Sequence, residues 1–176
     1  MNLGDSGLVR LISSDGAVVE LQPVSYQFSR PPGTRGAEGS STTGSYADWD
    51  ANWLVIRGDI RTSDGQSWTF TDACLTTWEA EQLSLWLRAA GSDNAAAGLD
   101  PAVFTEPNLS FFLDGVQAGR VRMRLRLSHE SLPRRLRWEA SGGEASEHDI
   151  ALEVSGADLA EAAQAWDRDR LPFPAR

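Results

Sequence analysis

We predict an α+β fold for this chain of 176 residues: a mainly antiparallel sheet of about seven strands in hairpins, with two helices. Three observations support this prediction. Asp-Gly pairs separate runs in which apolar and polar residues alternate, which is typical of β-hairpins. Two longer segments carry apolar residues at helical spacing, and the first of them follows a capping-box pattern. The strands follow one another in hairpins, so the sequence does not predict a doubly wound parallel sheet.

The hairpin turns are the clearest local signals. Asp and Gly both tolerate the positive φ angles that two-residue hairpin turns require. Three such pairs lie between alternating runs: Asp15-Gly16, Asp64-Gly65 and Asp114-Gly115. Three hairpins give six strands, and residues 148–154 give a seventh because their apolar and polar residues alternate. Pro23 interrupts the second strand where the alternation changes phase, which predicts a bulge or an edge position.

The two helices are predicted from their N-termini and their apolar stripes. Thr76 and Glu79 have the spacing of a capping box, and Gly91 is placed to end the helix that follows. The stripe of this helix is Ala80, Leu83, Trp86, Leu87 and Ala90. The second helix is predicted to begin near Ser155. Its stripe is Leu159, Ala162, Ala163 and Trp166.

Composition limits the class of protein and its surroundings. We expect one domain over 1–176, with a flexible Gly/Ser-rich loop at 31–45 that lacks large apolar residues. The net charge of −9 disfavours nucleic acid as a ligand, because phosphate repels an acidic surface. No apolar run reaches membrane-spanning length, so no membrane partner is expected. A single cysteine, and no signal-peptide pattern after Met1, favour a cytoplasmic location.

Charge is distributed unevenly along the chain. All sixteen basic residues are arginine, and residues 120–137 hold seven of them with one glutamate. Alternate positions of one predicted strand are Arg120, Arg122, Arg124 and Arg126. This row of arginines could bind an anion, or it could form ion pairs with a neighbouring strand. The strand that holds Asp149 and Glu153 has a matching alternation, so we expect Arg122 and Arg124 to face these acids.

Cys74, the only cysteine, lies just before the first predicted helix. A helix N-terminus can stabilise a thiolate, but a thiolate nucleophile usually also needs a histidine base. The sequence has two histidines, His129 and His148, and no pattern in it places either of them beside Cys74. Free cysteines are commonly buried as small apolar residues. We therefore expect Cys74 to be a buried structural residue.

No motif for catalysis, metal binding or cofactor binding occurs in the sequence. There is no C-x-x-C, H-x-x-x-H, G-x-G-x-x-G or phosphate-binding loop, and no nucleophile elbow around a serine. The sequence therefore predicts a protein that acts by binding, without a cofactor or metal, and not an enzyme. A carboxylate pair assembled from distant residues leaves no motif, so an enzyme stays as a third hypothesis.

Seven tryptophans could fill the core or stack on a ligand. Trp68, Trp86 and Trp166 fall on predicted core stripes, whereas Trp49 and Trp138 have polar neighbours and are surface candidates. Short polar side chains often satisfy the backbone of turns. Residues expected to do so here are Asp48, Asp50, Asn52, Glu106 and Asn108.

Four groups of residues carry a resemblance to a known family. They are Asn52-Trp53-Leu54, Trp68-x-Phe70-x-Asp72, Cys74-Leu75-x-x-Trp78-Glu79 and Phe104-Thr105-Glu106-Pro107-Asn108. With these groups, residues 18–170 resemble the WapI-type immunity family of bacteria, whose members are taken to be antidotes of polymorphic toxins. The loop at 31–45 and the arginine-rich strand depart from that resemblance. The resemblance implies a non-catalytic cytoplasmic immunity protein that binds and neutralises one cognate toxin.

The charge of the chain suggests which partner and which residues are involved. Outside residues 120–137 the chain has nine arginines and twenty-four acids. An acidic antidote suits a basic toxin domain, because complementary charge accelerates encounter. The expected toxin-binding residues are Asp48, Trp49, Asp50, Glu79 and Glu81. The alternative is a small-molecule or peptide-binding module, and a toxin gene immediately upstream would distinguish the two.

Overall fold

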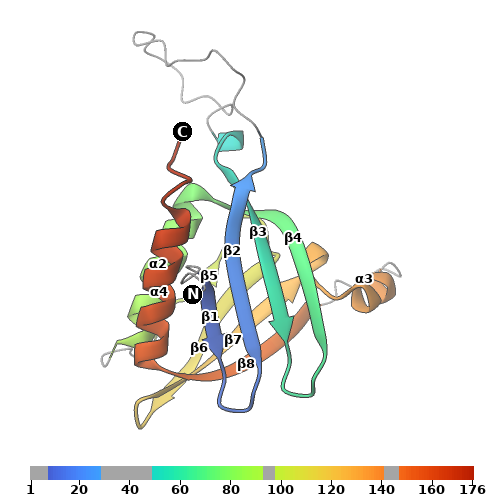
Figure 1. Ribbon diagram of the computed structural model, residues 1–176. Coiled ribbons are helices and arrows are strands. Elements are labelled where there is room, and N and C mark those ends of the chain that lie inside the picture. The colour runs from blue at the N-terminus through green and yellow to red at the C-terminus, as the bar shows by residue number, and fades with distance from the viewer. Residues whose placement is uncertain (1–7, 29–48, 93–97, 141–146) are drawn as a thin grey trace, which may run out of the picture.

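A computed structural model of the protein describes residues 8–28, 49–92, 98–140 and 147–176, with the side chains of 138–140 left out. The first of two antiparallel sheets has the order β1-β2-β3-β4 (Figure 1). Its strands are β1 (Val9–Ile12), β2 (Val18–Tyr26), β3 (Trp53–Arg61) and β4 (Ser67–Thr76). The second sheet has the order β5-β6-β7-β8. Its strands are β5 (Ala102–Val103), β6 (Leu109–Gln117), β7 (Arg120–Ser128) and β8 (Glu147–Ser155).

Both long helices begin where the sequence predicts. Helix α2 (Thr77–Gly91) has Thr76 as its N-cap, and helix α4 (Gly156–Arg170) has Ser155. Each N-cap forms a complete capping box, which satisfies two of the backbone N–H groups that a helix N-terminus leaves unpaired. All residues of the two predicted apolar stripes are buried. Two shorter elements follow β7: the 3₁₀ helix η1 (His129–Ser131) and helix α3 (Arg134–Ala140).

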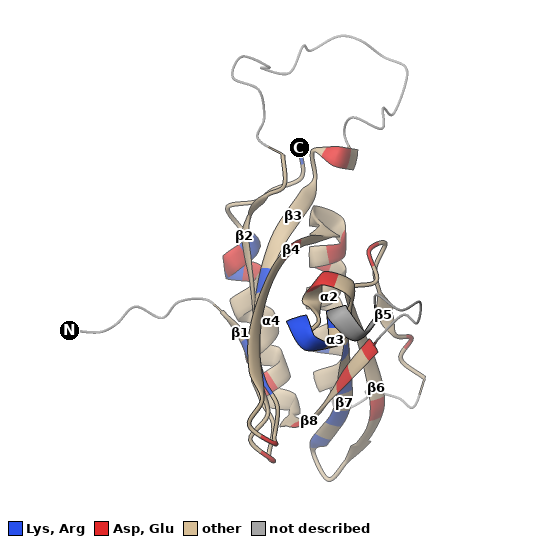
Figure 2. Ribbon diagram, turned by 90° about the vertical axis from the view of Figure 1, so that its right-hand side faces the viewer, with Lys and Arg blue, Asp and Glu red and all other residues tan. Residues whose placement is uncertain are grey.

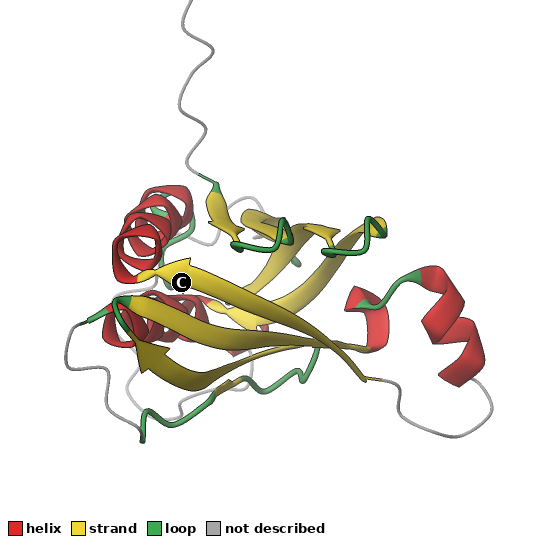
Figure 3. Ribbon diagram, turned by 90° about the horizontal axis from the view of Figure 1, so that it is seen from below, coloured by secondary structure: helices red, strands yellow, loops and turns green. Residues whose placement is uncertain are grey.

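The two sheets face each other across one apolar core. Helices α2 and α4 lie side by side along one side of the sheets, and α3 lies on the opposite side (Figure 3). The core draws residues from both sheets and both long helices, among them Leu21, Ile56, Leu83, Leu125 and Trp166. Trp166 and Trp86 are 0% and 7% exposed, which confirms their predicted place in the core, and Trp68 is partly buried against it.

Two glycines let the long helices approach each other closely. A Cβ atom on Gly91 would lie 2.7 Å from the carbonyl oxygen of Gly156, and one on Gly156 would lie 2.4 Å from that of Gly91. Contacts of this length are too short for any residue with a side chain. The indole N–H of Trp166 donates to the Ala80 carbonyl at 2.6 Å, which ties the same two helices together further along.

The predicted turns are correct in two of the three hairpins. Asp15-Gly16 and Asp64-Gly65 lie in the β1–β2 and β3–β4 turns. The third prediction is wrong, because β6 continues through Asp114-Gly115 to Gln117. The turn is formed by Ala118 and Gly119, whose φ angles of 51° and 74° match what a two-residue hairpin requires. Asp114-Gly115 instead lies at a bulge, where the register against β7 shifts.

The α+β prediction is confirmed, with eight strands in two sheets and three helices in the part of the chain that the structure describes. The predicted irregularity at Pro23 is also confirmed, because the register between β2 and β3 shifts between Pro23 and Ser25. Sequence patterns missed β5, which has two residues, and α3, which has seven. The loop predicted at 31–45 lies outside the described residues. No described helix is long and apolar enough to cross a membrane.

Candidate functional site

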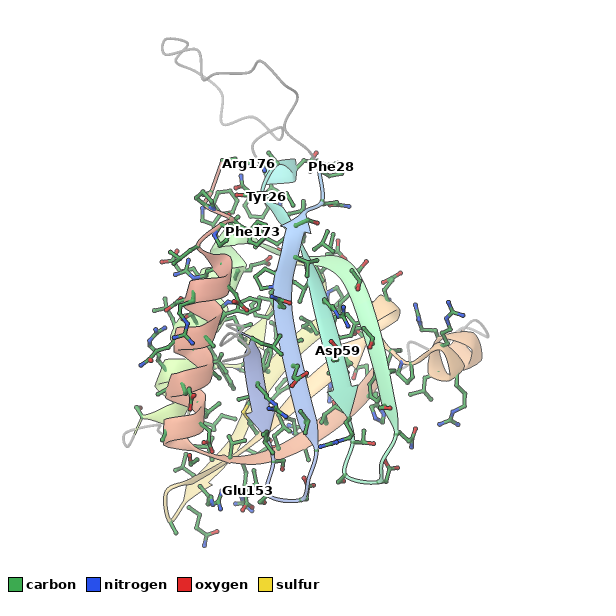
Figure 4. All side chains as sticks on the ribbon, in the orientation of Figure 1. Tyr26, Phe28, Asp59, Glu153, Phe173 and Arg176 are labelled. Carbon is green, nitrogen blue, oxygen red and sulfur yellow. The ribbon has the colours of Figure 1, made fainter. Side chains whose placement is uncertain are left out.

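Three exposed aromatic residues gather at one end of the first sheet. Phe28 follows β2, Trp49 precedes β3 and Trp78 lies in the first turn of α2, and they are 52%, 47% and 39% exposed. The rings of Trp49 and Trp78 stack, with centroids 5.3 Å apart. We call Phe28, Trp49 and Trp78 the aromatic pole; Figure 4 labels Phe28 there. Exposed apolar surface of this kind, rich in tryptophan, is typical of protein interaction sites.

Asn52 holds the pole together from beneath. Its backbone N–H donates to the Trp49 carbonyl at 3.1 Å, and its carbonyl accepts from the Thr77 N–H at 3.0 Å. Its side-chain Oδ1 accepts a further bond from the Thr77 hydroxyl at 3.2 Å. The residue is fully buried. These bonds fix the 49–52 turn against the first turn of α2, which explains how Trp49 reaches Trp78.

The C-terminal segment of the chain lies beside the pole. The Asn52 carboxamide contacts both backbone groups of Arg176: Nδ2 donates to its backbone oxygen at 3.1 Å, and Oδ1 accepts from its N–H at 2.8 Å. The Tyr26 hydroxyl donates to the Pro174 carbonyl. The Arg176 guanidinium lies over the Tyr26 ring, 3.3 Å from its centroid, and Phe173 meets the same ring edge-on at 5.5 Å (Figure 4).

The acids expected to bind a partner differ in their exposure. Asp50 is exposed and follows Trp49 in the chain. Glu81 is exposed on the outer side of α2. Asp48 lies outside the described residues. Figure 2 shows an acidic helical turn near the C-terminus, well away from the basic residues of α3. The structure therefore places Trp49, Asp50 and Glu81 on accessible surface.

Glu79 stabilises the fold and is mostly buried. It is only 8% exposed, although it carries a charge. Its Oε2 accepts from the Thr76 N–H at 2.8 Å, which completes the capping box. Its Oε1 accepts from the Thr105 N–H at 2.6 Å, which ties the loop before β6 to the start of α2. Both oxygens are therefore occupied by backbone donors, and Glu79 supports the surface without presenting its charge there.

A second polar group joins the loop at 104–108 to β4. The Asn108 side chain donates to Asp72 at 2.7 Å and to Glu130 at 3.3 Å. Burial raises the pKa of Asp72, and the nearby carboxylate of Glu130 raises it further. Asn108 is buried and bonds to carboxylates, so it cross-links elements and does not satisfy a local turn as the sequence suggested. Its own carbonyl accepts from Ser128 N–H at 3.1 Å.

Cys74 is buried, as predicted. Its exposure is 0%, and its side chain lies in the core beneath α2. Burial raises the pKa of the thiol, and the nearby Asp72 and Glu79 raise it further. Both effects disfavour the thiolate, which is the nucleophilic form. The surroundings of Cys74 are therefore opposite to those of a catalytic cysteine.

We predict that the Cys74 thiol reacts slowly in the native protein. A thiol-specific dye should label it at least about a hundredfold more slowly at pH 7.5 than it labels the chain in denaturant, because reaction needs both exposure and a thiolate. Labelling of the folded protein at the rate of a free thiol would contradict this prediction. Cys74→Ala should be unreactive in both conditions and serves as the control.

Two arginines of the row on β7, Arg124 and Arg126, form ion pairs with acids, which confirms the prediction for Arg124. Arg124 bonds to Asp149 at 3.1 Å and to Asp114 at 2.9 Å, and Arg126 bonds to Asp149 at 2.8 Å. Arg122 lies opposite Glu153 in the register of β7 and β8. The arginines lower the pKa of Asp149, Arg126 having the larger effect. These pairs neutralise Arg124 and Arg126, so this half of the row is a poor anion site.

The outer face of the first sheet has a hollow of about 550 Å³ away from the pole. Its polar lining is mixed in charge, with Arg10, Glu20, Asp59 and Arg61. Arg10 pairs with Glu20 at 2.9 Å, and Asp59 accepts from both Arg57 and Thr69. Charges that already neutralise one another provide no evident ligand chemistry. Within the described residues there is also no group of three His, Cys, Asp or Glu residues that could hold a metal ion.

We expect Asp169, in the last turn of α4, to make the stability of the protein depend on pH. Its Oδ2 is buried and has no hydrogen-bond partner among the described residues, and burial raises its pKa to about 6. The folded state then binds this proton more tightly than the unfolded chain, in which the pKa is near 3.8. The contribution of Asp169 to stability is therefore present below about pH 4 and is lost as pH rises to about 6.

We predict that Asp169→Asn raises the melting temperature at pH 7.5 and changes it little at pH 4. The neutral amide avoids the cost of burying a charge, which the native protein bears only above its raised pKa. Asp158→Asn, on the same helix, is the matched control and should lower the melting temperature at pH 7.5, because the Ser155 capping bonds lower the pKa of Asp158. Equal effects of Asp169→Asn at the two pH values would contradict the prediction.

Several residues of this site were not identified from the sequence as binding residues. The segment after α4 lies beside β2, although the two are far apart in sequence. This packing brings Phe173 and Arg176 to Tyr26. Trp78 belongs to one of the four groups that carry the resemblance, but its exposure depends on which side of α2 faces the core. Asn52 gave a partial signal, since a polar residue directly before a buried strand is typical of a turn.

A family model described as the immunity protein WapI-like family matches residues 10–174. The match includes all four groups of residues that carried the resemblance, as well as Tyr26, Asn52 and Phe173. No curated protein and no solved structure matches the chain.

Proposed function

Because this chain belongs to the immunity protein WapI-like family, we propose that it binds a cognate bacterial toxin in the cytoplasm and neutralises it without catalysis. The observation that supports this proposal best is the exposed stack of Trp49 and Trp78 beside Asp50. Tryptophan is enriched among the residues that dominate protein interfaces, and a polar rim commonly surrounds them. We propose that the aromatic pole is the centre of the interface, with Asp50 and Glu81 at its rim.

The proposed toxin domain is basic. The net charge of −9 would attract a basic partner, and Arg124 and Arg126 of β7 are engaged with acids of their own sheet. Glu79 is not part of this proposed rim, because backbone N–H groups occupy both of its oxygens. Asp48 remains a proposed rim residue by its position next to Trp49 in the chain.

The test of the proposed function begins with a search for a toxin gene immediately upstream, whose toxin domain is then produced, with and without this chain, in a sensitive host. Cells that produce both proteins should grow, and cells that produce the toxin domain alone should not. The purified proteins should form a stoichiometric complex that lacks the toxic activity. Growth arrest despite equal production of both proteins, with no complex in vitro, would contradict the proposal.

We predict that Glu81→Arg slows association with this toxin domain. A charge at the rim mainly steers encounter, so the association rate should fall about three- to tenfold at about 50 mM salt, and the difference should shrink at about 200 mM salt. The dissociation rate should change little. Rates should be measured by surface plasmon resonance or stopped flow.

Glu161→Arg is the matched control for Glu81→Arg. Glu161 is exposed on α4, so the variant makes the same change in net charge on the other long helix. It should slow association less than Glu81→Arg. If both variants have the same association rate at each salt concentration, only the net charge of the protein affects association, and Glu81 is not part of the rim of the interface.

A further inference from the structure

The residues that hold the C-terminal segment form a site that reads polypeptide backbone. Asn52 donates to the backbone oxygen and accepts from the N–H of one residue, Arg176, and the Tyr26 hydroxyl donates to the carbonyl of Pro174. None of these bonds involves a side chain of the bound segment. A peptide of different sequence could therefore make all of them, as happens when extended peptides are recognised through their backbone.

One side-chain position in this site selects for a cation. The Arg176 guanidinium lies 3.3 Å from the centroid of the Tyr26 ring, and its Nη1 donates to the Phe28 carbonyl at 3.3 Å. A ring face and a carbonyl oxygen together favour a planar cation over a neutral or acidic side chain. The exposed carboxylate of Asp50, two residues from Asn52, adds charge of the right sign.

The site is built independently of the segment that occupies it. Asn52 is fully buried and is oriented by the Thr77 hydroxyl and by backbone bonds to Trp49 and Thr77. Tyr26 belongs to β2 and packs against the core. The occupying segment is different, since it follows the end of α4 and residues 174–176 are exposed. Loss of this segment would leave Asn52 and Tyr26 held in position by other parts of the protein.

We propose that Tyr26 and Asn52 form a binding site for an extended, arginine-containing segment of a partner protein, and that residues 174–176 of this chain occupy the site in its absence. The partner segment makes the same backbone bonds and places its guanidinium on Tyr26. The exposed rings of Phe28, Trp49 and Trp78 border the site and supply apolar contacts that the chain's own segment leaves accessible. The site does not require toxin neutralisation, so it can be tested without a toxin.

The probe is a capped peptide, acetyl-Pro-Phe-Pro-Ala-Arg-amide, which reproduces residues 172–176 without terminal charges. It should be titrated into ¹⁵N-labelled Arg176→Ala protein while the side-chain amide signal of Asn52 is followed. This variant weakens the attached segment but leaves Tyr26 and Asn52 unchanged. Saturable binding below about 1 mM is expected, with the Asn52 amide signal moving. The wild-type chain should bind the peptide at least about tenfold more weakly, because its attached segment is present at millimolar effective concentration.

The same peptide with alanine in place of its arginine tests the choice of a cation. It should bind Arg176→Ala protein about three- to thirtyfold more weakly, the range expected for loss of a cation–π contact. A second protein variant, Arg176→Pro, also removes the N–H group that donates to Asn52. It should bind the arginine peptide at least as tightly as the Arg176→Ala protein does. Absence of saturable binding to both variants, with native spectra, or equal affinity for the two peptides would overturn the proposal. Either result leaves the proposal of toxin binding through the aromatic pole untouched.

Discussion

Trp49→Ala and Trp78→Ala are each expected to weaken binding of the toxin domain by about 2 kcal/mol, or about 30-fold in Kd, the size of a typical interface hot spot. Each substitution removes a large exposed ring and also leaves the other ring without its stacking partner at 5.3 Å. The effect should lie mainly in the dissociation rate. The measurement is isothermal titration calorimetry with the purified toxin domain.

A double-mutant cycle distinguishes the two rings acting as a unit from two independent contacts. Because the rings stack, the double variant should lose less than the sum of the single losses, with a coupling of about 0.5–1.5 kcal/mol. Val116→Ala, an exposed apolar residue of β6 on the other sheet, is the control and should bind as the wild type does. If both tryptophan variants bind within twofold of the wild type while remaining folded, the pole is not the interface.

Gly58→Ala is expected to destabilise the folded protein severely. Gly58 lies opposite Phe70 in the β3–β4 register, and the Phe70 ring covers it. A Cβ atom on Gly58 would lie 2.1 Å from Cε1 and 2.3 Å from Cζ of this ring, which is 4% exposed. Overpacking of this kind costs about 3 kcal/mol, a large part of the stability of a typical domain. Urea denaturation followed by tryptophan fluorescence measures the change.

A second substitution identifies the cause of that loss. In the double variant Gly58→Ala/Phe70→Leu the ring that meets the new methyl group is gone. Its loss of unfolding free energy should therefore be smaller than the sum of the losses of the two single variants by at least about 1 kcal/mol. A loss within about 0.5 kcal/mol of zero for Gly58→Ala would show that the ring moves freely aside. If the free-energy losses of the two single variants add fully, the backbone conformation at Gly58, and not the Phe70 ring, is what requires a glycine there.

Local signals in the sequence account for most of the fold. The capping box at Thr76 predicted the first long helix, because the bonds that start a helix are made within four residues, and the apolar stripe after Ser155 predicted the second. Asp114-Gly115 was misread because the same pair suits a bulge as well as a turn, and Ala118 adopts a positive φ that its side chain does not favour. The division of the strands into two sheets depends on long-range packing, which leaves no local pattern.

The candidate site was predicted in part, through individual residues and not through their arrangement. Trp49 and its acidic neighbour Asp50 could be recognised as surface residues by their polar surroundings. Glu79 could be recognised as a capping residue, but its second bond, to the Thr105 N–H, required the fold. The contact of Asn52 with Arg176 joins residues that lie far apart in the chain. Neither their spacing nor their composition indicates that they meet.

The most direct test of the proposed interface is the set of tryptophan indole N–H signals in the NMR spectrum of the toxin complex. Three indoles are internal references, since Trp68, Trp86 and Trp166 donate to carbonyls of Ser131, Asp100 and Ala80 within the protein. Binding at the aromatic pole should shift or broaden the signals of Trp49 and Trp78 and leave those three in place. A complex that forms with the Trp49 and Trp78 signals unchanged would contradict an interface at the aromatic pole.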